Sequence, residues 1–152
     1  MTKVYLALYK GKKIGNSPSA LLARSADFLV RKFTKGIYSH CELALKSNNQ
    51  FICYSSSIRE GGVRRKVMNL DKDKWDLIEL HEVTEKQIES YFKQTKGMKY
   101  DFWGAIGIVL CIKQKRSKFF CSEWCFNAIK NSDQGWRFSP NHIAVIFKGL
   151  SV

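Results

Sequence analysis

Short segments with the spacing of β-strands follow one another through the middle of the chain, between segments with helical spacing. The strand-like segments are 4–9, 40–45, 50–56, 63–70 and 75–81. A Lys-Ser-Asn-Asn turn joins the second to the third, which is typical of a β-hairpin, and Gly61-Gly62 turns the chain into the fourth. This order predicts an α+β domain with a central antiparallel sheet and helices packed against it.

The predicted helices begin at residues that cap the free backbone N–H groups of a first turn. Ser17-Pro18 opens a stretch that carries apolar residues at helical spacing: Leu21, Leu22, Ala26, Leu29, Val30 and Phe33. Thr84 to Gln87 matches the capping box, in which the Thr accepts from the third residue's N–H and the Gln reaches back. That helix ends at Gly97. Further helices are predicted over 102–112 and 121–130, and after Ser139-Pro140.

Length and composition are those of one globular domain, over residues 1–152. Apolar residues make up 45% of the chain and charged residues 26%, which excludes a disordered or collagen-like protein. Lys and Arg number 26 against 13 acidic residues, so the net charge is +13. This excess predicts an anionic partner, whether nucleic acid, a membrane surface or a cell-wall polymer, without choosing among them.

Basic residues gather at 10–13, 64–66 and 113–118. The third cluster lies just before Cys121 and could guide an anionic substrate, although solvated loops are the more common use of such runs. No helix-turn-helix, zinc finger or RNA-stacking pattern accompanies them. We therefore expect non-specific contact with anionic polymers or membrane surfaces rather than sequence-specific nucleic-acid recognition.

Cysteine usage and hydropathy predict a protein of a reducing compartment. The five cysteines form no set of well-spaced pairs, and an odd count leaves at least one thiol free. The first residues resemble a strand rather than a secretory signal. The longest apolar run, 102–112, is about half of what spans a bilayer. We expect no transmembrane segment and a cytoplasmic location.

Cys121 is the first candidate for chemistry because it opens a predicted helix. Free N–H groups and the helix dipole at that position favour an anion, which lowers the pKa of a thiol towards the nucleophilic thiolate. The same N–H groups, including that of Cys121, can bind the oxyanion of an acyl-transfer reaction. Burial as a small apolar residue is the simpler interpretation of Cys121 taken alone.

His40 is the candidate base, since a nucleophilic thiol needs an imidazole within hydrogen-bond reach and a third group to orient that ring. If 40–45 and 50–56 form a hairpin, strand alternation directs Ser55 or Ser56 towards the imidazole. A core histidine is the alternative for His40. A zinc site using the cysteines and His40 is disfavoured, because the tight ligand pairs of such sites are missing.

Five groups of residues, in this order, resemble the circularly permuted branch of the papain-like NlpC/P60 superfamily, which includes the YiiX-like and lecithin:retinol acyltransferase-like enzymes. They are Tyr38–Leu43, Tyr54–Arg64, Tyr100–Gly104, Phe120–Cys125 and Ser139-Pro140. The similarity is greatest to small members encoded by bacterial viruses. His40 precedes Cys121, whereas ordinary NlpC/P60 enzymes have the cysteine first.

The resemblance implies roles for several of these residues. Cys121 corresponds to the nucleophile, His40 to the general base, and Tyr100 to a family tyrosine near the active site. YiiX-like relatives have a Glu on the strand after the histidine and retinol acyltransferases a second His, whereas this chain has Ser55 and Ser56 there. Glu42, two residues after His40, is an alternative third member.

The function expected from these features is a cysteine hydrolase, an amidase or peptidase or an acyl-ester hydrolase, that works through an acyl-enzyme. Its substrate would be a peptide, a peptidoglycan stem or an acyl lipid, and it would need no cofactor or metal. If encoded by a virus, it would act in the bacterial host cytoplasm or from the virus particle. The alternative is a basic binding module of the same fold with little or no turnover, which engages a host protein, nucleic acid or an anionic membrane.

Overall fold

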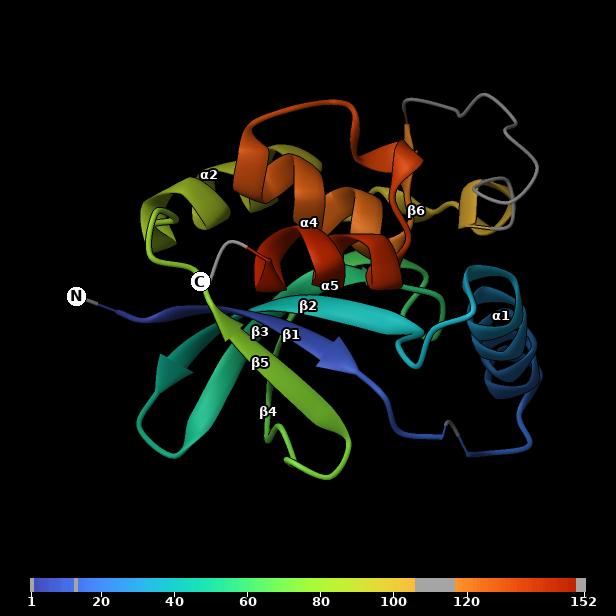
Figure 1. Cartoon of the computed structure of the whole chain (residues 1–152). Helices are drawn as coiled ribbons and strands as arrows, with labels where there is room; N and C mark the ends of the chain where they lie inside the picture. The colour runs from blue at the N-terminus through green and yellow to red at the C-terminus, as the bar shows by residue number, and fades with distance from the viewer. Residues whose placement is uncertain (1, 13, 106–116, 150–152) are drawn as a thin grey trace.

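A seven-stranded, curled sheet forms the centre of the computed structural model, which describes residues 2–12, 14–105 and 117–149 (Figure 1). The spatial order of the strands is β5-β1-β2-β3-β4-β6-β7. The strands are β1 (Val4–Tyr9), β2 (His40–Ser47), β3 (Gln50–Ser57), β4 (Gly62–Met68), β5 (Trp75–Glu79), β6 (Lys99–Tyr100) and β7 (Lys118–Phe119). All neighbours described pair antiparallel except β6 and β7. The predicted α+β class with a mainly antiparallel sheet is confirmed.

Helices α2, α4 and α5 lie together over one face of the sheet, while α1 stands at its side (Figure 1). Their bounds are α1 (Pro18–Thr34), α2 (Glu85–Thr95), α4 (Cys121–Lys130) and α5 (Pro140–Lys148), with a 3-10 turn at Gly135–Arg137. Of the predicted helix 102–112, residues 102–105 are helical, and the rest lies outside the described residues. No helix in the described ranges has the length and apolar character needed to cross a membrane.

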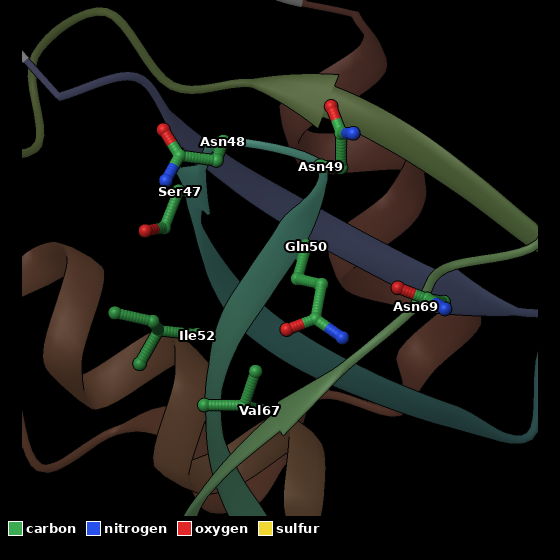
Figure 2. A pocket seen from close by; sticks show the side chains of 7 residues that line it. All are labelled: Ser47, Asn48, Asn49, Gln50, Ile52, Val67 and Asn69. Atoms are coloured by element: carbon green, nitrogen blue, oxygen red, sulfur yellow. The ribbon is translucent and has the colours of Figure 1, made fainter.

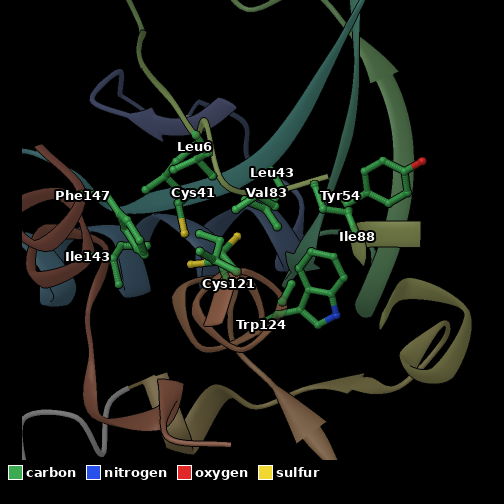
Figure 3. Packing of buried hydrophobic residues seen from close by; sticks show 14 of the residues in the cluster. Leu6, Cys41, Leu43, Tyr54, Val83, Ile88, Cys121, Trp124, Ile143 and Phe147 are labelled. Atoms are coloured by element: carbon green, nitrogen blue, oxygen red, sulfur yellow. The ribbon is translucent and has the colours of Figure 1, made fainter. Parts of the chain in front are cut away.

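The main core lies between the sheet and the helices on its covered face. Leu6, Leu43 and Tyr54 from the sheet pack with Trp124 of α4 and Ile143 of α5 (Figure 3). A smaller apolar cluster, which includes Ala7, Ala44, Cys53 and Trp75, occupies the other face. The alternation of strand side chains produces these two clusters, and α4 is fixed against the middle of the sheet.

One prediction about a helix cap was wrong in detail. Gln87 does not reach back to its own N-cap; its side-chain amide donates to the carbonyls of Ala128 and Ile129 at 2.8 and 2.9 Å. These are among the last carbonyls of α4, which have no partner within that helix. Helix α1 begins after Ser17 as predicted, buries small residues and leaves Leu21, Leu22, Phe28 and Phe33 exposed.

Strands β6 and β7 are too short to show in the sequence, yet they bring Tyr100 next to the start of α4. The N–H of Tyr100 donates to the carbonyl of Gly61 at 3.0 Å, and Tyr100 pairs with Phe119 of β7. Gly62 pairs with Lys99, and both Gly61 and Gly62 have positive φ angles. At Gly62, a Cβ atom would overlap the backbone carbonyl of Met98.

We predict that Gly62→Ala destabilises the fold more than Gly61→Ala. An alanine at Gly61, which has φ of +79° and open space around it, meets only backbone strain of about 1–2 kcal/mol. At Gly62 the clash with Met98 adds about 1–3 kcal/mol, because the obstacle is backbone. Urea unfolding of both variants measures the difference in free energy. Equal losses would contradict the close approach of β6 to β4.

Candidate active site

Cys121 is the first residue of α4, as predicted, and its side chain faces β2. The preceding Phe120 is extended and buried, and its N–H donates to Glu123 in the first turn. Cys121 is only 4% exposed. The first N–H groups of a helix lack intrahelical acceptors, so this end of α4 presents donors beside the thiol.

His40 is brought to Cys121 although 81 positions separate them in the sequence (121 − 40). It is the first residue of β2, pairs with Tyr9 of β1, and its ring lies edge-on to Trp75. The imidazole is hydrogen-bonded to the Cys121 thiol. Its side chain is 13% exposed. The structure therefore brings the two residues together from the helix and the sheet.

Glu42 occupies the third position of the site. Its Oε1 lies 2.9 Å from Nε2 of His40. Both carboxylate oxygens also accept hydrogen bonds from the guanidinium of Arg64, at 2.5 Å each, and Arg64 in turn donates to Glu60 at 2.6 Å. Glu42 is 1% exposed, so its charge is held by these partners rather than by water.

The serine hydroxyls of β3 make different contacts from those expected. Ser55 donates to the carbonyl of Cys41 at 2.7 Å, and Ser56 donates to the carbonyl of Phe119 at 2.6 Å. Both serines are fully buried. They fasten β3 to β2 and to the segment that leads into Cys121, and it is Glu42 that pairs with the imidazole ring of His40.

A second thiol, that of Cys41, lies against Cys121. It is hydrogen-bonded to Cys121 and to Cys125, one turn further along α4, and Figure 3 shows the Cys41 side chain directed towards Cys121. Burial raises the pKa of Cys41 well above its ordinary value. Cys41 therefore stays protonated and can donate to a thiolate at Cys121.

These contacts set the ionisation of the pair. The hydrogen bond from Cys41, against the penalty of burial, together with the nearby His40, holds the pKa of Cys121 well below its usual range. Burial disfavours the imidazolium, but Cys121 and Glu42 outweigh burial and raise the pKa of His40. For Glu42, Arg64 and His40 likewise outweigh burial and lower the pKa. A thiolate–imidazolium pair is favoured between the two shifted pKa values.

Tyr100 stands near the two thiols, as the resemblance implied. Burial, and then the negative charge of a Cys121 thiolate, raise its pKa well above the ordinary value, so the phenol stays neutral. With His40 it lines a cavity of about 50 Å³, whose other wall includes Ala23 and Ala26 of α1. Ligand pockets commonly measure about 300–1,000 Å³, so this cavity beneath α1 is smaller than a typical ligand pocket.

A larger hollow lies at the other end of β2 (Figure 2). It measures about 490 Å³ and is lined mainly by amide and hydroxyl side chains from the β2–β3 turn and from the end of β4, such as Asn48 and Asn69. Figure 2 shows no aromatic or charged side chain among those that line it. It holds none of the candidate catalytic residues, which sit at the opposite end of the strand.

Several residues of the basic clusters form ion pairs with acidic side chains of the same chain. Arg64 pairs with Glu42 and Glu60, Lys66 with Glu60, and Lys10 with Asp76. Lys13 and residues 113–116 lie outside the described residues. Within the described ranges, no group of three or more His, Cys, Asp or Glu side chains is placed to hold a metal ion.

Cys41 and Arg64 were not predicted as parts of the site. Leu43 pairs with Tyr54, and extending that register by one residue sets Glu42 opposite Ser55, which pairs with Arg64. Correct alignment of the three strands would have revealed a buried carboxylate facing an arginine. The contact of Cys41 with α4 has no comparable local signal.

We predict that Glu42→Gln lowers the pKa of His40, because the imidazolium loses a carboxylate partner. The pair would then lose its proton at a lower pH, which moves the upper limit of thiolate–imidazolium formation downward. NMR titration of the ring protons measures this shift. Glu60→Gln is the matched control, since Glu60 touches Arg64 but not the ring. The same His40 pKa in both variants would contradict the pairing.

No protein-family model and no curated protein matches this chain. The candidate active site is therefore defined by its own geometry.

Proposed function

We propose that the protein is a cysteine hydrolase that cleaves an amide or ester through an acyl-enzyme. Its main support is the contact of the Cys121 thiol with the His40 imidazole, whose Nε2 pairs with Glu42. Nucleophile, base and orienting carboxylate are the components of a thiol hydrolase site. A core histidine would need neither the thiol nor the buried carboxylate.

The reaction would proceed in two halves. The Cys121 thiolate attacks the substrate carbonyl carbon, and the resulting oxyanion is stabilised by N–H groups at the start of α4. Collapse forms the thioester and expels the amine or alcohol, which takes the proton from His40. Water then gives a proton to His40 and attacks the thioester, so that the acid leaves and the thiolate returns.

Family and substrate are proposed from the sequence resemblance. In this chain the proposed nucleophile follows the histidine in the sequence and begins a helix that packs on an antiparallel sheet. Both features agree with a circularly permuted NlpC/P60 enzyme. Its substrate class would be a peptide, a peptidoglycan stem or an acyl lipid, in a bacterial host cytoplasm or delivered with a virus particle. The residues at the site supply attack, proton transfer and oxyanion binding without a cofactor.

The test is acylation by an activated ester, p-nitrophenyl acetate. We expect an acetyl adduct on Cys121 by mass spectrometry and turnover reduced at least about a hundredfold by Cys121→Ser and by His40→Ala, the size of effect expected for such groups. Cys53→Ser is the matched control, since Cys53 is a buried thiol in the opposite apolar cluster. Equal turnover in all variants, or an adduct on other cysteines, would overturn the proposal.

The second candidate is a binding module of this fold with little or no turnover. The small size of the cavity at His40 and the net charge of +13 favour it. Such a module would engage a host protein, nucleic acid or an anionic membrane. It differs from the enzyme in the same experiment, because it would form no adduct at Cys121 while the fold remains intact.

A further inference from the structure

Helix α1 buries mainly small residues and exposes most of its large apolar residues. The buried positions are Ala20, Ala23, Ala26 and Asp27. The outward positions include Leu21, Leu22, Phe28 and Phe33, and Phe28 is 61% exposed. A surface helix normally directs its apolar stripe to the core. The reversed arrangement of α1 leaves an apolar surface, Leu21/Leu22/Phe28/Phe33, which we call the α1 outer face.

Positive charge surrounds the α1 outer face. Arg24, Lys32 and Lys35 are exposed on or next to it, and the Lys32 ammonium lies 5.5 Å from the Phe28 ring centre. The only acidic residue between positions 10 and 41 is Asp27, which is buried and pairs with Arg31 at 3.3 Å. The solvent-exposed surface of α1 therefore consists of apolar and cationic groups and has no exposed carboxylate.

Further exposed apolar residues flank the helix in the sequence or follow a residue of the cavity that it lines. Ile14 and Ile37 lie just before and just after α1, and both are exposed. Trp103, 76% exposed, comes three residues after Tyr100, which lines the same cavity as Ala23 of α1. Exposed tryptophan, apolar and basic side chains are the residue types typical of proteins at a membrane–water interface.

We infer that the α1 outer face is a docking surface for an anionic lipid bilayer. A convex helix of 17 residues, about 25 Å long, suits burial in the plane of the interface. Apolar side chains would enter the acyl boundary while Arg24, Lys32 and Lys35 meet lipid phosphates. Since the inner side of α1 walls the cavity at His40, a docked bilayer lies against the helix that covers the candidate site.

Binding of the full chain to vesicles tests the inference. We expect flotation with phosphatidylcholine vesicles that contain one quarter phosphatidylglycerol, and much weaker flotation with phosphatidylcholine alone. Lys32→Gln should weaken binding about fivefold, the effect of one cation near an anionic surface. Its control is Lys86→Gln, an exposed lysine on α2, which should change binding less than twofold. Leu22→Ser with Phe28→Ser should weaken binding at least tenfold.

The matched control for the apolar variant is Val67→Ser with Val145→Ser, two exposed apolar residues on β4 and α5. Thermal unfolding shows whether each variant keeps its fold, and Lys32→Gln tests the same face without loss of an apolar group. Absence of binding to anionic vesicles overturns the inference, as does binding that only the control substitutions weaken. Self-association abolished by Phe28→Ser, without vesicle binding, would identify a protein interface instead.

Discussion

The contact between the start of α4 and the start of β2 determines the rest of the site. Cys121 meets His40 and Cys41 there because α4 packs through Trp124 and Cys125 onto the covered face of the sheet. A shift of the helix along the sheet would separate thiol from imidazole, so the core that fixes α4 also fixes the chemistry. Packing of this kind restricts both partners to one arrangement.

A series of hydrogen-bonded ion pairs extends from this contact across the neighbouring strands. The imidazole is held by Glu42 of β2, and Glu42 by Arg64 of β4, which a second carboxylate, Glu60, also contacts. The pKa of Glu60 is lowered to about 2, because its contacts with Lys66 and Arg64 outweigh the effect of burial. A buried carboxylate can stay ionised beside His40 only because the half-buried Arg64 guanidinium balances it, which explains why one arginine of a basic cluster turns towards the interior.

Local patterns predicted much of the fold, since strands, caps and helix starts depend on neighbouring residues. Helix α4 begins at Cys121 as predicted, and β1 covers the predicted residues. The features that could not be predicted depend on tertiary contacts. The side-chain partners of Ser55 were not predictable from alternation alone, because a carbonyl of β2 lay within reach. For α1, helical spacing identified the helix but not which of its faces meets the sheet.

The proposed chemistry requires Cys121 to be a thiolate at neutral pH, paired with His40. The most direct measurement is the ultraviolet absorbance of thiolate as a function of pH, taken as the difference between the wild-type protein and Cys121→Ser. We expect one thiolate already present at pH 7, which becomes protonated only at a pH well below the ordinary thiol pKa of about 8.5. A difference that appears only above pH 8 would contradict this expectation.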